Sequence, residues 1–113
     1  MDRFGAGMLA LMVAILAAQG SPGAAADISA GRRKAMQCAV CHGQNGIAVN
    51  PEAPNLAGEA PIYIEKQLKA FRSGERKSEQ MSIMAKDLSD ADIGDLAAWY
   101  AAIKVSAEPP PIK

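Results

Sequence analysis

The clearest pattern of apolar and polar positions lies near the C-terminus, in the stretch LSDADIGDLAAWYAAIK (88–104). Its apolar residues recur every three or four positions, as on one face of a helix. They are Ile93, Leu96, Ala97, Tyr100 and Ile103. Ser89, followed by Asp92 three residues later, has the spacing of a capping box. The pattern therefore predicts a helix that begins directly after Ser89.

A second helix is predicted near the middle of the chain. Ile64, Leu68 and Phe71 are four and three residues apart and would form one apolar stripe. The segment begins at Pro61, which suits the first turn of a helix, and ends at Gly74.

The segments before this helix are less regular. Ser29 is predicted to cap a first helix that runs to about Cys38, with Ala35 and Met36 on its inner face. Residues 44–59 are rich in Gly, Asn and Pro, which predicts an irregular segment. Because no stretch alternates as a strand would, the sequence predicts an all-α fold.

The N-terminus has the pattern of an export signal. Arg3 precedes an apolar run over residues 4–18, and three alanines end at Ala26. A membrane anchor is the alternative, but the run is shorter than the ~20 apolar residues that cross a bilayer. We therefore expect residues 1–26 to be a signal peptide, 27–106 one domain, and 107–113 a Pro-rich C-terminal tail.

Composition excludes one class of partner. The 113 residues contain 12 basic and 12 acidic side chains, so the net charge is zero. Loss of residues 1–26 removes one of each and leaves the balance unchanged. A nucleic-acid-binding domain would be strongly basic. A domain this small also has few large apolar residues, which favours a fold stabilised by a bound group.

The two cysteines and the single histidine of the chain all lie in the stretch QCAVCHG (37–43). A disulfide between Cys38 and Cys41 would close a loop too short to contribute much stability. A thioredoxin-like pair belongs in a strand-rich βαβ context, and a structural zinc site needs four Cys or His ligands. What remains is Cys-x-x-Cys-His as the attachment site of a c-type haem, in which His42 supplies the proximal nitrogen.

Four motifs in order carry a family resemblance: Cys38–Gly43, APNLAG (53–58), QLKAFRSGER (67–76) and MSIMAKDLSDADIGDLAAWYA (81–101). The chain resembles the class I cytochromes c, especially small bacterial ones with a single haem and the separate halves of two-haem periplasmic ones. The resemblance implies a small class I cytochrome c fold, with three main helices packed around one covalently bound haem.

The same resemblance implies roles for residues outside the attachment motif. The carbonyl of Pro54 is expected to accept a hydrogen bond from the imidazole of His42, which would fix the orientation of the ring. Gly31 is expected to let the first helix cross the last one closely, against Leu96 and Trp99.

The sixth iron ligand is expected to be a methionine. Met81 and Met84 are both expected in a loop before Leu88, and the family's ligand stands seven residues before that leucine, which selects Met81. Met84 is then the alternative ligand. Met36, just before Cys38, is expected in the core instead.

These features predict a periplasmic electron carrier rather than an enzyme, since His42 and Met81 would fill both axial positions. Its partners would be redox proteins, a donor and an acceptor, with no nucleic acid and no small-molecule substrate. Contact with a membrane would come only through a membrane-bound redox partner, and the protein would be a monomer. Two alternatives are the haem-carrying subunit of an exported dehydrogenase or oxidase, and a gas-binding haem sensor.

Overall fold

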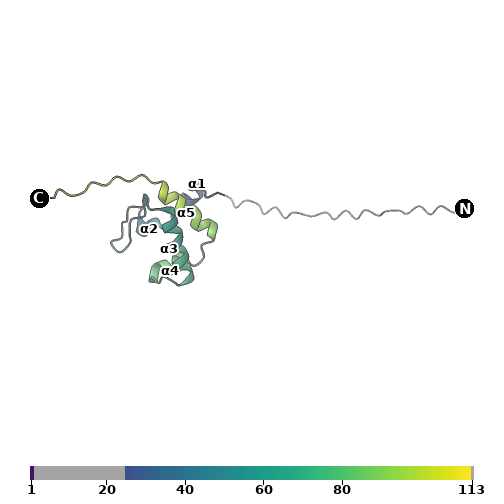
Figure 1. The fold of residues 1–113 in the computed structure, drawn as a ribbon. Helices are drawn as coiled ribbons and strands as arrows, with labels where there is room; N and C mark the ends of the chain where they lie inside the picture. Colours follow the sequence, from purple (N-terminus) through teal and green to yellow (C-terminus); the bar gives the residue numbers. More distant parts are fainter. Residues whose placement is uncertain (2–24, 113) are drawn as a thin grey trace.

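The computed structural model describes residues 1 and 25–112, so the expected signal segment lies outside the described part apart from its two ends (Figure 1). Its helices are α1 (Ile28–Lys34), α2 (Ala39–His42), α3 (Pro61–Ser73), α4 (Glu79–Ala85) and α5 (Asp90–Ala102). The described residues contain no strand, which confirms the all-α prediction. The main helices are α1, α3 and α5, and both α1 and α3 pack against α5.

Local sequence explains the two long helices. The hydroxyl of Ser89 accepts from the backbone N–H of Asp92, and the Asp92 carboxylate accepts from the N–H of Ser89, both at 3.0 Å. The predicted capping box at the start of α5 is therefore confirmed. Pro61 occupies the first turn of α3, and Gly74 ends it in the left-handed conformation, with φ of 82°.

The predicted start and end of the first helix were wrong by a few residues. Asp27, and not Ser29, caps α1, because its carboxylate accepts from the backbone N–H groups of Ser29 and Ala30. The helix also ends at Lys34 instead of reaching Cys38, since residues 35–38 form turns. These turns redirect the chain into α2.

The hydrophobic core lies where α1, α3 and α5 meet. Its buried members are Ala35, Ile64, Leu96, Ala97 and Tyr100, each at most 5% exposed. The expectation that Met36 would join this core was wrong, because its side chain is 75% exposed. The turn after α1 points Ala35 inward and leaves its neighbour Met36 in solvent.

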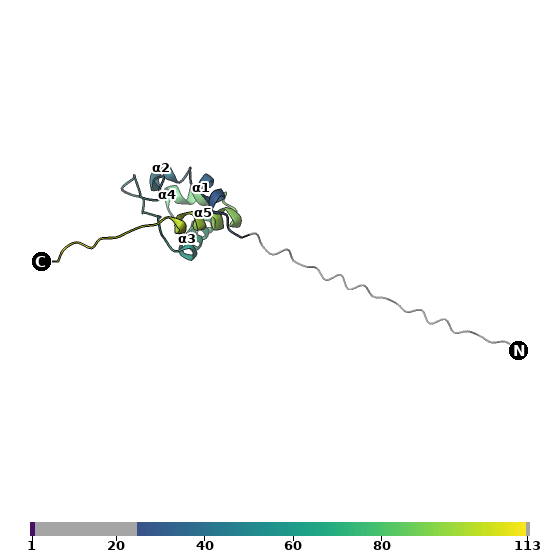
Figure 2. The same ribbon diagram turned by 90° about the horizontal axis from the view of Figure 1, so that it is seen from above.

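Gly31 sits where α1 crosses α5, two helices that lie side by side in both ribbon views (Figure 2). A Cβ on Gly31 would collide with the backbone carbonyl of Asp95 and would lie 2.9 Å from the Cβ of Trp99. The predicted close crossing is therefore present, with Asp95 rather than Leu96 as the nearest neighbour.

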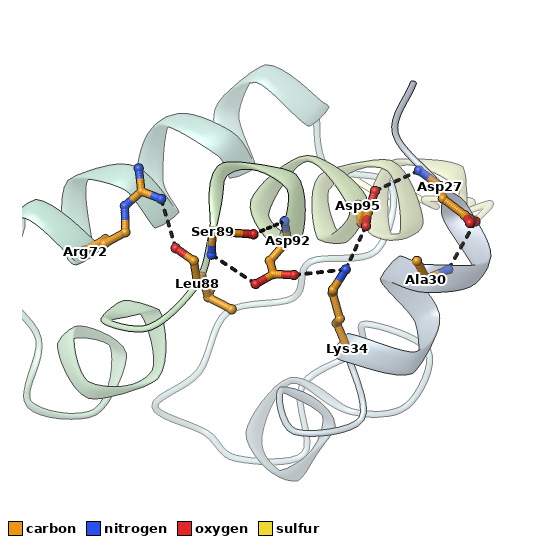
Figure 3. Close-up of polar contacts among 8 residues, drawn as sticks. All are labelled: Asp27, Ala30, Lys34, Arg72, Leu88, Ser89, Asp92 and Asp95. Carbon is orange, nitrogen blue, oxygen red and sulfur yellow. Dashed lines mark hydrogen bonds and ion pairs between the residues drawn. The ribbon is translucent and has the colours of Figure 1, made fainter. Parts of the chain in front are cut away.

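Acidic side chains in the first two turns of α5 bind cations from two other helices. Lys34 of α1 lies 3.0 Å from Asp92 and 2.8 Å from Asp95 (Figure 3). Arg72 of α3 lies 2.7 Å from Asp90. Each of these carboxyl groups has a lowered pKa, because hydrogen bonds to its carboxylate stabilise the charged form.

Candidate functional site

The helix α2 is a single turn that presents the attachment motif. The backbone N–H of His42 donates to the carbonyl of Cys38 at 2.9 Å, which places both cysteines and the histidine on one short helical turn. Gly43 ends this turn with φ of 77°, and a Cβ there would collide with the backbone of Ile47. The glycine therefore lets the chain fold back tightly under the motif.

The imidazole of His42 is only 6% exposed and has one clear hydrogen-bond partner. Its Nδ1 lies 2.8 Å from the backbone carbonyl oxygen of Pro54. A carbonyl can only accept, so this contact places the proton of the neutral ring on Nδ1 and leaves the lone pair on Nε2. The irregular segment that contains Pro54 thus sets the orientation of the ring.

The two cysteines are both half-buried, and no disulfide joins them. The loop after α2 holds Cys41 from one side, because the side-chain amide of Asn50 lies 3.8 Å from its sulfur. The backbone N–H groups of Val49 and Asn50 also donate to the Cys41 carbonyl, at 3.0 and 3.1 Å. Nothing in the sequence marked Asn50, since one Asn in a loop has many other uses.

Cys38 faces the core side of the same site. Burial raises the pKa of its thiol. Tyr100 is 2% exposed, and its buried hydroxyl has no hydrogen-bond partner within the described residues. Burial also raises the pKa of this hydroxyl, which therefore keeps its proton. The sequence placed Tyr100 on the inner face of a helix but gave no sign that its hydroxyl reaches the site.

These side chains surround a cavity of about 630 Å³. The motif residues and Pro54 line one side, Leu68 and Phe71 of α3 line another, and Met81 and Met84 of α4 complete it. A volume of this size and a mostly apolar lining are typical of cofactor sites. The sequence predicted the motif, but only the fold shows which other residues share its cavity.

Both candidate methionine ligands lie on the short helix α4. The prediction that they lie in a loop before Leu88 was therefore wrong. Ser78 caps that helix by accepting from the N–H of Met81 at 3.2 Å. Arg72 of α3 donates to the carbonyl of Leu88 at 2.9 Å and anchors the connection to α5. Met81 is half-buried, whereas Met84 is 38% exposed.

Comparison with known proteins shows which family has these features. A model of the family described as "Cytochrome c" matches residues 28–102. The chain belongs to the cytochrome c family. Cytochrome c-554(548) of Halomonas halodenitrificans is 44% identical over 68% of this chain and 96% of its own length. A thiosulfate dehydrogenase electron acceptor of Thiomonas intermedia is 41% identical over 79% of this chain and 42% of its own length.

A solved structure agrees with this assignment. Reduced cytochrome c4 from Pseudomonas stutzeri superposes with a TM-score of 0.67 at 36% identity, covering 73% of this chain and 48% of that one. Besides the Halomonas cytochrome, which it nearly covers, the chain thus spans about half the length of these larger relatives. The class I cytochrome c fold predicted from the sequence is confirmed.

Family membership implies a covalently bound haem c with its iron, and the residues of the cavity fit it. Cys38 and Cys41 sit at the Cys-x-x-Cys-His positions that form thioethers with a haem. His42 offers a free Nε2, and the apolar walls suit a porphyrin. When bound, haem c supplies reversible one-electron chemistry at iron.

Proposed function

We propose that the protein is an exported electron carrier whose haem iron is held by His42 on one side and by Met81 on the other. The observation that supports this most directly is the cavity itself, which both side chains line from different helices. The contact with Pro54 fixes the orientation of the His42 imidazole, so its Nε2 would bind iron without a change in the ring position. Two protein ligands leave no position for a substrate, which favours electron transfer over catalysis.

The choice of Met81 over Met84 is supported by exposure and by position. A ligand sulfur has to point into the cavity, and Met81 is the more buried of the two side chains. Its backbone N–H is also fixed by the Ser78 cap, which holds this part of α4 in place. Met84, at 38% exposure, suits the rim of the cavity better.

Export is the proposed route to the periplasm. The sequence pattern of residues 1–26 supports a signal peptide cleaved near Ala26, although residues 2–24 lie outside the described part. No helix among residues 25–112 is both long and apolar enough to cross a bilayer. We further propose a monomeric domain over residues 27–106, followed by the Pro-rich tail 107–113, with redox proteins as electron donor and acceptor.

A second function is favoured by one comparison. One relative is named for accepting electrons from thiosulfate dehydrogenase, and this chain covers less than half of it. The protein could therefore serve as one haem-carrying part of an exported dehydrogenase or oxidase. Size-exclusion chromatography of native extract separates the two functions, because a free carrier elutes at the mass of a single domain, whereas a subunit elutes with its complex.

The test of the main proposal is a spectrum of the reduced protein with and without carbon monoxide. A haem with both axial positions filled by His42 and Met81 should show the same spectrum under both conditions. A large change in the main haem band on adding carbon monoxide would contradict the proposal and would favour the gas-binding sensor. Met81→Ala serves as the positive control, because it should open the sixth position to the gas.

A further inference from the structure

The backbone nitrogen of Asp27 makes an unusual long-range contact. It donates to Oδ1 of Asp95 at 2.8 Å and so joins the start of α1 to α5, as drawn in Figure 3. The other oxygen of the same carboxylate accepts from Lys34 at 2.8 Å. The side chain of Asp95 is only 14% exposed, so this contact lies at the edge of the helix–helix interface.

Asp27 is also the residue that would follow the proposed cleavage site. Ala25 and Ala26 are exposed and have no regular secondary structure, so the preceding peptide bond lies outside the packed domain. Hydrolysis of the Ala26–Asp27 bond consumes one water. The carbonyl carbon of Ala26 leaves as a carboxylate, and the nitrogen of Asp27 becomes a primary amine. An α-amino group with an ordinary pKa of about 7.7–8.0 takes up a proton in neutral solution.

We infer that removal of the signal peptide creates an ion pair between the new α-ammonium of Asp27 and the carboxylate of Asp95, so that this contact between α1 and α5 carries a charge on both sides only in the processed protein. The inference rests on the proposed export. Before cleavage the same nitrogen is a neutral amide donor. After cleavage it is a charged donor at the same place, so the attraction between two opposite charges is added to a hydrogen bond whose acceptor is already ionised.

Electrostatics at the start of α1 show why the carboxylate matters. A positive charge at a helix N-terminus opposes the helix dipole, so a free α-ammonium there would weaken α1. The side chain of Asp27 already accepts from Ser29 and Ala30 as the helix cap. Asp95 provides a second carboxylate, which is ionised at neutral pH because the N–H of Asp27 and then Lys34 lower its pKa.

The pH dependence follows from the charged groups in this cluster, which are the carboxylates of Asp27, Asp92 and Asp95 and the ammonium of Lys34. Pairing with Asp95 raises the pKa of the α-amino group in the folded protein above its unfolded value of about 7.7–8.0. The stabilisation is then fully present below that unfolded value and is lost as the pH rises through the folded pKa. Lys34 keeps its charge over this range, because its own pKa is raised by Asp95 and Asp92.

The test compares two forms of the haem-loaded protein, one beginning at Asp27 and one beginning at Ala25. The longer form keeps the hydrogen bond but moves the charge by two residues. At pH 6 the form that begins at Asp27 should melt about 2–5 °C higher, as expected for one partly exposed ion pair in a small domain. The difference should vanish near pH 10. An NMR titration should show a raised α-amino pKa in the form that begins at Asp27.

Two substitutions provide the matched control. Asp95→Asn should abolish the difference in melting temperature between the two forms, whereas Asp92→Asn, which also removes a partner of Lys34, should preserve it. If the two forms melt at the same temperature and the α-amino pKa is ordinary, the ion pair does not form. That result would not contradict the proposed export of the protein. Mass spectrometry of the exported protein tests whether cleavage occurs between Ala26 and Asp27. A mature chain that begins at another residue would overturn the inference, because Asp27 would then carry no α-amino group.

Discussion

The carbonyl carbon of Asp95 lies 2.6 Å from the point that a Cβ on Gly31 would occupy. Real side chains do not approach a backbone this closely, so α1 and α5 can keep their present spacing only with glycine at this position. The contact between these helices joins the two ends of the domain and forms one wall of the core.

Gly31→Ala should therefore destabilise the protein by about 1–3 kcal/mol, the usual cost of overpacking, and lower its melting temperature. Gly94→Ala is the matched control, because Gly94 lies inside α5 and a Cβ there would meet nothing within 4 Å. It should raise stability by about 0.5–1 kcal/mol through helix propensity. Urea denaturation of the haem-loaded proteins measures both. A neutral Gly31→Ala would show that the two helices can separate at little cost.

Replacing Cys38 and Cys41 together by Ser should remove the covalent haem and leave a largely disordered or molten chain. The core is small, and the 630 Å³ cavity would have to be filled by water or by collapse. Mass spectrometry of the denatured wild-type protein should show the polypeptide plus one haem. Circular dichroism with thermal melting reports on the fold of the variant. A cooperative melt with native-like helix content in the haem-free variant would contradict this prediction.

Met81→Ala should abolish the far-red absorption band that a sulfur–iron bond gives to the oxidised protein. It should also lower the reduction potential by a sizeable part of the ~0.8 V range that axial ligands span, because a thioether favours ferrous iron. Met84→Ala should change neither property. Optical spectra and redox titrations of both variants decide the assignment, and the reverse outcome would make Met84 the ligand.

Electron transfer should proceed through an exposed apolar rim beside the cavity. Val40 lines the cavity and is 77% exposed, and Ile83 is 73% exposed on α4. Val40→Asp or Ile83→Asp should slow electron transfer to the native partner several-fold without altering the spectrum. Because acidic and basic residues balance, the rate of the wild type should depend only weakly on salt.

Ile62→Asp is the matched control for Val40→Asp, since Ile62 is equally exposed, at 78%, but does not line the haem cavity, whereas Val40 does. Stopped-flow kinetics at low and moderate ionic strength measure the wild type and the variants at Val40, Ile83, Ile62 and Lys69. Three basic residues of α3, Lys66, Lys69 and Arg72, offer the alternative docking surface. A steep fall of the rate with salt, together with sensitivity to Lys69→Glu and indifference to Val40→Asp, would move the docking surface to these residues.

Local signals in the sequence explain which parts of the fold could be predicted. The start of α5 depends on Ser89 and Asp92, which are three residues apart, and the end of α3 depends on Gly74 alone. The helix α4 was missed because seven residues carry no clear apolar period, and its position depends on the Ser78 cap and on packing against α3. The cap of α1 was misassigned because Asp27 and Ser29 are both good capping residues two positions apart.

The residues of the site also fall into those that a local sequence pattern predicts and those that it does not. The attachment motif is contiguous in the chain, so its spacing alone indicated haem. The roles of Asn50 and Tyr100 depend on contacts between segments far apart in sequence, and no local pattern could reveal them. The resemblance to a known family filled part of this gap by singling out Pro54, whose carbonyl contacts His42. Met81 as the sixth ligand stays a prediction.

The acidic residues in the first two turns of α5 also limit the stability of the protein at low pH. Asp90, Asp92 and Asp95 connect α5 to α3 and α1, and each has a lowered pKa. The stability that they contribute is present above the ordinary carboxyl pKa of about 3.9 and is lost as the pH falls through their lower folded values. Protonation in that interval would remove the ion pairs that join α5 to both neighbouring helices, so acid should weaken these two contacts before it disturbs the apolar core.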